Sequence, residues 1–249
     1  MVLNEFKLDG KVTIISACGR TLLKELTLSL AQAGAKVVLT AKDSEDLMQI
    51  VLTVQREGWE VVAIPTELTC AKEVQSMVDQ VIQRFGRIDI LINNLNLEYW
   101  KPFLDMSEKE WHQVIDANLT STFLCSKAVG RYMTERKAGR IVNILSGLSE
   151  RGLSNGAVYC ASMGGMLQLT RALALEWASQ NVRVNAIGVG WMEEPLIGEK
   201  KDVVGGYIPM GRRARPKDVT PLVLFLASEA SSFLNGNIYL VDGGLMSRS

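Results

Sequence analysis

Two hydroxyl side chains and one side-chain amide have the chemistry to act together on a carbonyl or hydroxyl group. Ser146 and Tyr159 stand 13 positions apart, and Asn118 precedes both. Brought together, such groups can cradle a carbonyl oxygen or an oxyanion by hydrogen bonding. A free tyrosine titrates near ~10, and lowering its pKa to ~7 requires about 4 kcal/mol from its surroundings. The residues around Tyr159 therefore decide whether it acts as an acid or as a base.

The position four residues after Tyr159 carries no charge. Residues i and i+4 share one face of a helix, so a cation there would lower the pKa of the phenol. Met163 offers only a thioether, and no lysine occurs between Lys137 and Lys200. We predict that Tyr159 is neutral at neutral pH, a donor of hydrogen bonds or protons but a poor base.

The elements that must position these residues alternate along the chain. Short β-branched runs predict strands at 11–17, 36–41, 60–65, 88–93, 140–146 and 183–190. Three- and four-residue apolar spacing predicts helices at 22–33, 44–57, 71–85, 107–136 and 158–179. This alternation predicts a doubly wound parallel sheet, with ligands beyond the carboxyl ends of the strands. The irregular stretch 193–206 is predicted to form a flap over the site.

Composition excludes several classes of protein. A chain of 249 residues with 47% hydrophobic residues fits a single packed α/β domain over 1–249. The 27 basic and 27 acidic residues balance, which disfavours nucleic acid and anionic lipid as partners. No apolar run reaches the ~18 residues of a membrane span. Four widely spaced cysteines argue against zinc and secreted scaffolds, and favour a cytoplasmic protein.

Ordered motifs along nearly the whole chain resemble those of the short-chain dehydrogenase/reductase family, which are single-domain, nicotinamide-dependent oxidoreductases. The motifs are Lys-Val at 11–12, Ala-Gly-Ala at 33–35, Phe-Gly-Arg-Ile-Asp-Ile-Leu-Ile-Asn-Asn at 85–94, Asn118, Gly-Arg-Ile-Val-Asn-Ile at 139–144, Val-Arg-Val-Asn-Ala-Ile at 182–187 and Val-Asp-Gly-Gly at 241–244. The resemblance implies a seven-stranded Rossmann-like sheet, with Asn118, Ser146 and Tyr159 as the catalytic residues. It also implies a homodimer or homotetramer, with an apolar stripe at the subunit seam. The stripe comprises Met163, Met166, Leu169, Leu173 and Trp177.

The chain departs from the family pattern where the cofactor would bind. The family's loop after the first strand has three glycines that approach the cofactor pyrophosphate, and the aligned positions are Ala17, Thr21 and Leu23. The family's catalytic lysine aligns with Met163. These changes predict weak dinucleotide binding.

Three positions are the candidate cofactor contacts. Arg20 and Lys42 stand where relatives that prefer NADP place a cation, and Asn93 belongs to the motif of the fourth strand. NADP(H) is therefore the expected cofactor, if there is one.

Three functions are open at this point. The first is chemistry on a small carbonyl- or hydroxyl-bearing molecule through Ser146 and Tyr159, with hydride transfer weak or replaced by cofactor-independent chemistry. The second is a functional NADP(H)-dependent carbonyl reductase. The third is a non-catalytic binding or assembly subunit.

Overall fold

A single sheet of seven parallel strands forms the centre of the computed structural model, in the order β3-β2-β1-β4-β5-β6-β7. The structure describes residues 2–18, 22–193 and 205–247. The strands are β1 (Val12–Cys18), β2 (Lys36–Thr40), β3 (Val61–Ala63), β4 (Ile90–Leu95), β5 (Gly139–Ser146), β6 (Val182–Val189) and β7 (Ile238–Val241). The strand order reverses between β1 and β4, which confirms the predicted doubly wound sheet and places the expected ligand crevice beside these two strands.

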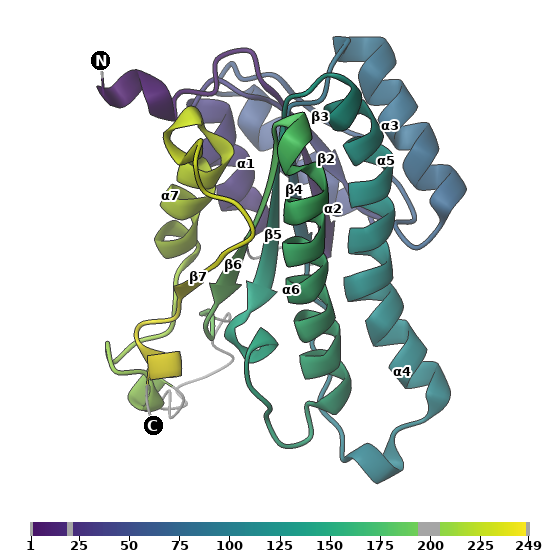
Figure 1. The fold of residues 1–249 in the computed structure, drawn as a ribbon, viewed down its shortest axis with the longest axis vertical. Coiled ribbons are helices and arrows are strands. Elements are labelled where there is room, and N and C mark those ends of the chain that lie inside the picture. Colours follow the sequence, from purple (N-terminus) through teal and green to yellow (C-terminus); the bar gives the residue numbers. More distant parts are fainter. Residues whose placement is uncertain (1, 19–21, 194–204, 248–249) are drawn as a thin grey trace.

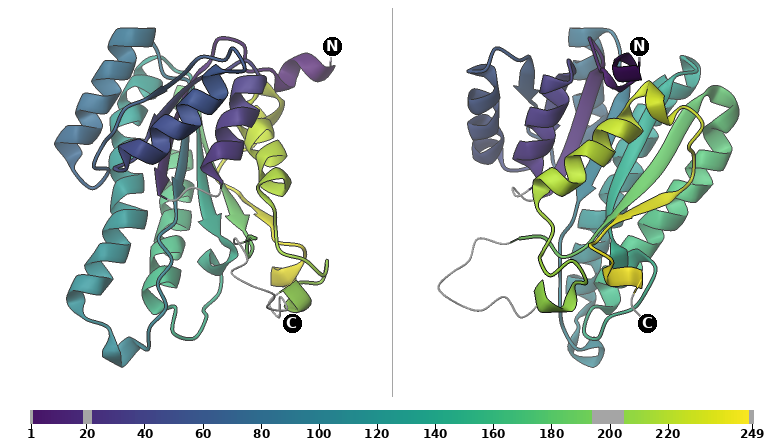
Figure 2. Two further views of the ribbon diagram at one scale, coloured as in Figure 1. Left: turned by 180° about the vertical axis from the view of Figure 1, so that it is seen from behind. Right: turned by 90° about the vertical axis from the view of Figure 1, so that its left-hand side faces the viewer.

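Helices cover both faces of the sheet. They are α1 (Leu23–Gln32), α2 (Ser44–Gln55), α3 (Ala71–Phe85), α4 (Glu108–Ile115), α5 (Ser121–Glu135), α6 (Ala157–Trp177) and α7 (Pro216–Ala227). Figure 1 looks onto the face that α3, α5 and α6 cover, and α1, α2 and α7 lie on the opposite face (Figure 2). Each layer buries its own apolar core against the sheet, because the strands of a covered parallel sheet are apolar on both sides.

The long helix predicted over 107–136 is interrupted. A capping box begins α4, in which the Ser107 hydroxyl accepts from the Glu110 backbone and the Glu110 carboxylate accepts from the Ser107 backbone. A π-helical turn over Asp116–Thr120 then separates α4 from α5. Apolar periodicity continues through such a turn, so the sequence pattern predicted one helix. The turn contains Asn118, and π-helical turns often occur at functional sites.

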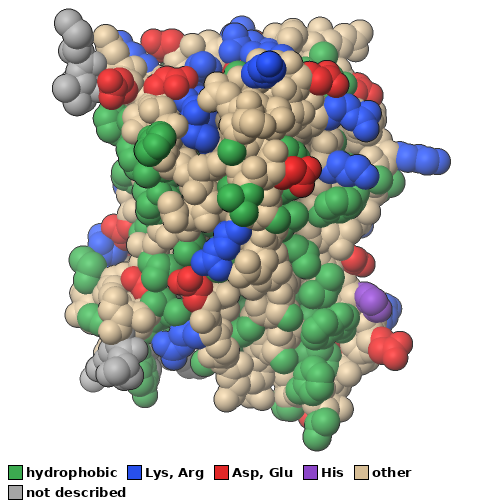
Figure 3. All heavy atoms as spheres, viewed as in Figure 1, with side chains coloured by type: hydrophobic (Ala, Val, Ile, Leu, Met, Phe, Trp, Pro, Cys, Tyr) green, Lys and Arg blue, Asp and Glu red, His purple; other side chains and the backbone are tan. Residues whose placement is uncertain are grey.

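The apolar stripe predicted for a subunit seam is only partly on the surface. Met163 and Met166 are fully buried in the core under α6, so their assignment to the seam is wrong. Leu169, Leu173 and Trp177 instead line a groove between α6 and α5. Hydrophobic side chains also gather on this face of the molecule (Figure 3). Among the described residues, no helix is both long and apolar enough to cross a membrane.

Candidate functional site

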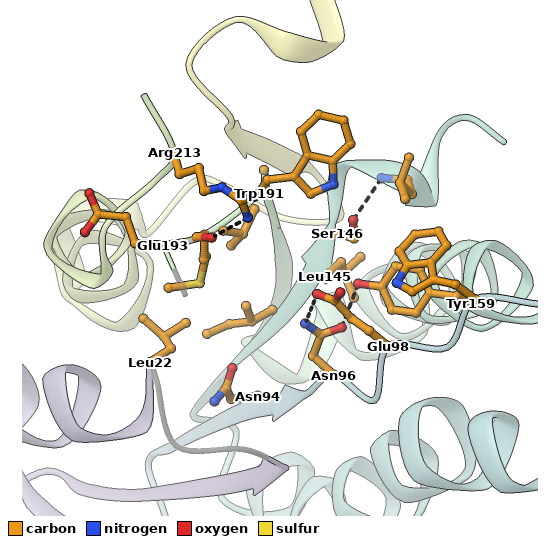
Figure 4. Close-up of a pocket in the computed structure, with 16 residues that line it drawn as sticks. Leu22, Asn94, Asn96, Glu98, Leu145, Ser146, Tyr159, Trp191, Glu193 and Arg213 are labelled. Atoms are coloured by element: carbon orange, nitrogen blue, oxygen red, sulfur yellow. Dashed lines mark hydrogen bonds between the residues drawn. The ribbon is translucent and has the colours of Figure 1, made fainter. Parts of the chain in front are cut away.

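A cleft opens beyond the carboxyl ends of β4, β5 and β6, where the strand topology predicts a ligand site. Its volume is about 260 Å³. Hydroxyl, amide and carboxylate groups share its walls with two tryptophans and several aliphatic side chains (Figure 4). The lining residues are Leu22, Asn94, Asn96, Glu98, Trp100, Ile144, Leu145, Ser146, Leu148, Tyr159, Val189, Gly190, Trp191, Met192, Glu193 and Arg213. Apolar walls with a few converging polar groups are typical of a small-molecule site.

Ser146 and Tyr159 meet in this cleft, as predicted from their order in the sequence. Ser146 is the last residue of β5, and Tyr159 lies in the first turn of α6. The Tyr159 hydroxyl donates a hydrogen bond of 2.6 Å to Oδ1 of Asn96. The Ser146 hydroxyl accepts from the backbone N–H of Leu148 at 3.2 Å, which orients its oxygen (Figure 4). Two hydroxyls are therefore fixed on one wall of the cleft.

The environment of Tyr159 keeps its phenol protonated. Burial, followed by the negative charge of Glu98, raises the pKa of Tyr159 above its ordinary value. Hydrogen bonds with Ser146 and Asn96 lower the pKa but do not reverse the shift. The side chain is a proton donor at neutral pH, and the phenolate that a base requires is rare.

Met163 fills the space one helical turn from Tyr159 and completes this environment. Its side chain is fully buried, and its sulfur accepts a weak hydrogen bond of 3.4 Å from the backbone N–H of Ser146. It therefore helps to hold the end of β5 but brings no charge to the phenol. Among the described residues that line the cleft, Arg213 is the one cation, and it donates to the backbone carbonyl of Met192 at 3.3 Å.

Asn118 lies behind the cleft and does not line it. Its Oδ1 accepts from the backbone N–H of Leu97 at 2.7 Å, and its Nδ2 donates to the Leu97 carbonyl and to the Ser162 hydroxyl at 3.1 and 3.0 Å. The side chain thus ties the loop after β4 to α6, which carries Tyr159. This geometry makes Asn118 a positioning residue.

Asn93 is enclosed within the sheet, away from the cleft. Its Oδ1 accepts from the Ser16 hydroxyl at 2.8 Å, and its Nδ2 donates to Oδ1 of Asn143 at 2.8 Å. These bonds link β1, β4 and β5, so Asn93 fixes the ends of the strands that border the site. The next residue, Asn94, lines the cleft in its place.

Lys42 follows β2 on the same edge of the sheet as the cleft. Its ammonium forms an ion pair of 2.6 Å with Glu67, and a hydrogen bond with that carboxylate is the main cause of its raised pKa. An ammonium has three donors, so a phosphate can bind beside Glu67. Arg20, another predicted cofactor residue, lies outside the described part of the chain, as does Thr21, which aligns with one of the family's glycines. Most of the predicted flap, 194–204, lies there too.

The described part of the site is compatible with a dinucleotide lying across the strand ends. Leu22, Val189 and Gly190 contribute apolar surface to the cleft, and Lys42 offers a cation further along the same edge of the sheet. Ala17 and Leu23, which stand at two of the family's glycine positions, are buried among the core of α1, so they do not block the cleft. In the part of the chain that the structure describes, no group of three or more His, Cys, Asp or Glu side chains could hold a metal ion.

Sequence reasoning missed the loop that follows β4. Asn96, Glu98 and Trp100 all line the cleft, although no periodic pattern marks them. The rule that ligands bind beyond strand ends was the signal that could have found them, since they come directly after a buried strand. Trp191 and Met192, after β6, line the cleft in the same way.

Comparison with known proteins gives matches along nearly the whole chain. The family model described as enoyl-(acyl carrier protein) reductase matches residues 24–246. The 5-keto-D-gluconate 5-reductase of Escherichia coli (strain K12) is 34% identical over 247 residues, which are 97% of this chain and 97% of that protein. A 3-oxoacyl-(acyl-carrier-protein) reductase of Thermotoga maritima is 33% identical over 244 residues, covering 96% of this chain and 99% of its own.

A solved structure agrees with these matches. A gluconate 5-dehydrogenase from Burkholderia cenocepacia J2315, in complex with NADP and tartrate, has a TM-score of 0.94 and 30% identity, and the match covers 100% of both chains. All of these relatives are described as reductases or dehydrogenases. They favour the reductase alternative over cofactor-independent chemistry.

Proposed function

The chain belongs to the short-chain dehydrogenase/reductase family, and on this premise we propose that it reduces a small carbonyl compound with NADPH. The observation that carries the proposal is the pair of fixed hydroxyls, Ser146 and Tyr159, on one wall of a cleft at the strand ends. The bound NADP of the Burkholderia relative supports this choice of cofactor.

The residues of this chain supply the oxygen side of the reaction. The Ser146 hydroxyl would hydrogen-bond the substrate carbonyl, and the Tyr159 hydroxyl would give its proton to the oxygen as the C=O double bond is reduced. NADPH, when bound, supplies the hydride that adds to the carbonyl carbon. Tyr159 then regains a proton from solvent. A neutral phenol is the protonation state that this direction of reaction requires.

Three groups would hold the cofactor in this proposal. Lys42, and Arg20 two residues after the end of β1 in the sequence, would bind the 2′-phosphate of NADPH. Leu22 would lie against the apolar part of the cofactor. Asn93 would act indirectly, by fixing the strand ends beneath the site.

The test is NADPH oxidation, followed by absorbance, with a panel of polar carbonyl compounds that includes 5-keto-D-gluconate. We expect turnover with at least one compound, and Tyr159→Phe should lower it by ~10²-fold or more. Unchanged activity in Tyr159→Phe would remove this residue from the mechanism. If no compound oxidises NADPH and NADPH does not raise the melting temperature, the reductase function is wrong.

One observation favours a second candidate, which is cofactor-independent chemistry. The Tyr159 hydroxyl donates its hydrogen bond to the side chain of Asn96, and Met163 supplies no cation beside the phenol. Conversion of a carbonyl or epoxide substrate in the absence of nucleotide, lost in Ser146→Ala, would establish this function instead.

We also propose a homodimer or homotetramer that works on a small molecule in the cytoplasm, without nucleic acid or membrane partners. The groove that contains Leu169, Leu173 and Trp177 supports a subunit contact, and the widely spaced cysteines support a reducing compartment. Light scattering after size exclusion would test the assembly, and a monomer at micromolar concentration would contradict it.

A further inference from the structure

A carboxylate with no ion-pair partner in the part of the chain that the structure describes lies at the reacting end of the cleft. Glu98 lines the cleft in the loop after β4, and its carboxylate accepts a long hydrogen bond of 3.5 Å from Nδ2 of Asn96, the residue that accepts from the Tyr159 hydroxyl. Within the described chain, no lysine or arginine forms an ion pair with Glu98. Figure 4 shows Glu98 beside Asn96 and Tyr159.

The remaining charges of the cleft lie on its opposite side. Figure 4 shows Arg213 and Glu193 together there, away from Tyr159. Glu193 is paired with Nε of Arg215 at 2.8 Å, so that its charge is balanced. The cleft is therefore negative near Tyr159, whereas its far end holds the cation Arg213 beside the paired Glu193 and Arg215.

An aromatic ring lies beside the same phenol. The ring of Trp100 is 5.4 Å from that of Tyr159, centre to centre, and 42% of the Trp100 side chain is exposed. Gly156 makes room for this tryptophan, because a Cβ there would lie 2.6 Å from a ring carbon of Trp100. A carboxylate and an indole at one end of a cleft match the chemistry that binds an ammonium group.

We propose that the substrate is a carbonyl compound carrying an ammonium group close to the carbonyl, and that Glu98 and Trp100 bind this ammonium. The inference rests on the proposed reductase function. It differs from the sugar acids named for relatives, because a substrate carboxylate near Tyr159 would be repelled by Glu98. Glu98 and Trp100 are thus assigned as specificity-determining residues.

A substrate cation would also compensate for a feature of this chain. The reduction places developing negative charge on the substrate oxygen, next to Glu98, and Met163 offers no positive charge to balance it. An ammonium on the neighbouring carbon lies between the carboxylate and that oxygen. It would stabilise the developing charge that Glu98 alone would disfavour.

Three carbonyl compounds of nearly equal size test the proposal. Aminoacetone is a cation at neutral pH, hydroxyacetone is neutral and pyruvate is an anion. We expect kcat/KM for NADPH-dependent reduction to be about tenfold higher for aminoacetone than for hydroxyacetone, with pyruvate the poorest. Glu98→Gln should lower the value for aminoacetone about tenfold and change that for hydroxyacetone less than about twofold. Equal values for aminoacetone and hydroxyacetone in the wild type would overturn the proposal.

A matched control and a binding measurement separate this inference from the reductase function. Glu108→Gln removes the same charge from an exposed position on α4, outside the cleft, and should leave the preference unchanged. Saturation-transfer NMR measures binding of aminoacetone and hydroxyacetone without turnover. If no compound oxidises NADPH but Glu98→Gln abolishes a preference for binding aminoacetone, the reductase function fails and the ammonium site stands. If the carbonyl compounds are reduced with no dependence on charge, the ammonium site fails and the reductase function stands.

Discussion

Alkaline pH should destabilise this protein through one buried phenol. Tyr159 is only 2% exposed, and burial and the charge of Glu98 raise its pKa above the ordinary value. Unfolding exposes the phenol to water, where it titrates near ~10. Because the folded-state pKa is the higher one, this contribution to stability is complete below pH ~10 and is lost as the pH rises beyond it. Between pH ~8 and ~11, ionisation of this phenol in the unfolded state lowers the unfolding free energy by about 1.4 kcal/mol.

Urea unfolding of the wild type and of Tyr159→Phe, at several pH values between ~8 and ~11, measures this cost. The two proteins share their other titrating groups, so the difference in unfolding free energy between them isolates the phenol. The wild type should lose about 1.4 kcal/mol more than the variant over this range. A difference that does not change with pH would refute the raised pKa of Tyr159.

The same ionisation sets the pH dependence of the proposed reduction. A phenol with a raised pKa keeps its proton throughout the neutral range, so kcat/KM for reduction should not fall between pH ~6 and ~9 through loss of this proton. A decline with an apparent pKa near ~7 would show instead that another group activates the phenol.

Three further substitutions test separate parts of the structure. Met163→Lys places an ammonium at a fully buried position and removes the acceptor of the Ser146 N–H, so it should lower the unfolding free energy by about 3 kcal/mol. Met163→Leu should lower it by less than about 1.5 kcal/mol, and equal urea midpoints for the two variants would contradict this expectation. Asp89→Asn removes a buried carboxylate that accepts from the Val12 N–H and pairs with the partly exposed Arg87, and it should cost about 2 kcal/mol by the same assay. In the wild type the pKa of Asp89 is lowered, so the stability that this carboxylate contributes is lost as the pH falls through the acid range. Lys42→Ala should raise KM for NADPH several-fold and leave KM for NADH unchanged, and an equal change for both would exclude a phosphate contact.

The fold was predictable because its signals are local and repeated. Alternating β-branched runs and amphipathic helices imply a doubly wound sheet, and small errors at the ends of elements do not alter that conclusion. The break within 107–136 was not predictable, since the π-helical turn over Asp116–Thr120 contains no proline or glycine that would mark it in the sequence. The burial of Met163 and Met166 was not predictable for a related reason. Their spacing shows that they share a face with Leu169 but not how far that face is covered by β5 and its loop.

The site was predictable where its residues end regular elements. Ser146 ends β5 and Tyr159 begins α6, so the topology alone brings them to one edge of the sheet. Asn93 and Asn94 are adjacent on β4, where successive side chains point to opposite faces, and the sequence does not say which one meets the cleft. Glu98 and Trp100 lie in an irregular loop, where only the folded path of the chain decides what they face.

The residues that distinguish this chain gather around a single hydroxyl. Asn96 accepts its proton in a hydrogen bond, Met163 provides packing in place of a charge, and Glu98 adds a negative field. Glu98 raises the pKa of Tyr159, and neither Met163 nor Asn96 gives the phenol a cation of the protein's own. A substrate that needs only a proton donor can react in such a site, and a substrate that brings its own positive charge reacts there best. The chain thus links the protonation state of its acid to the charge of the molecule it binds.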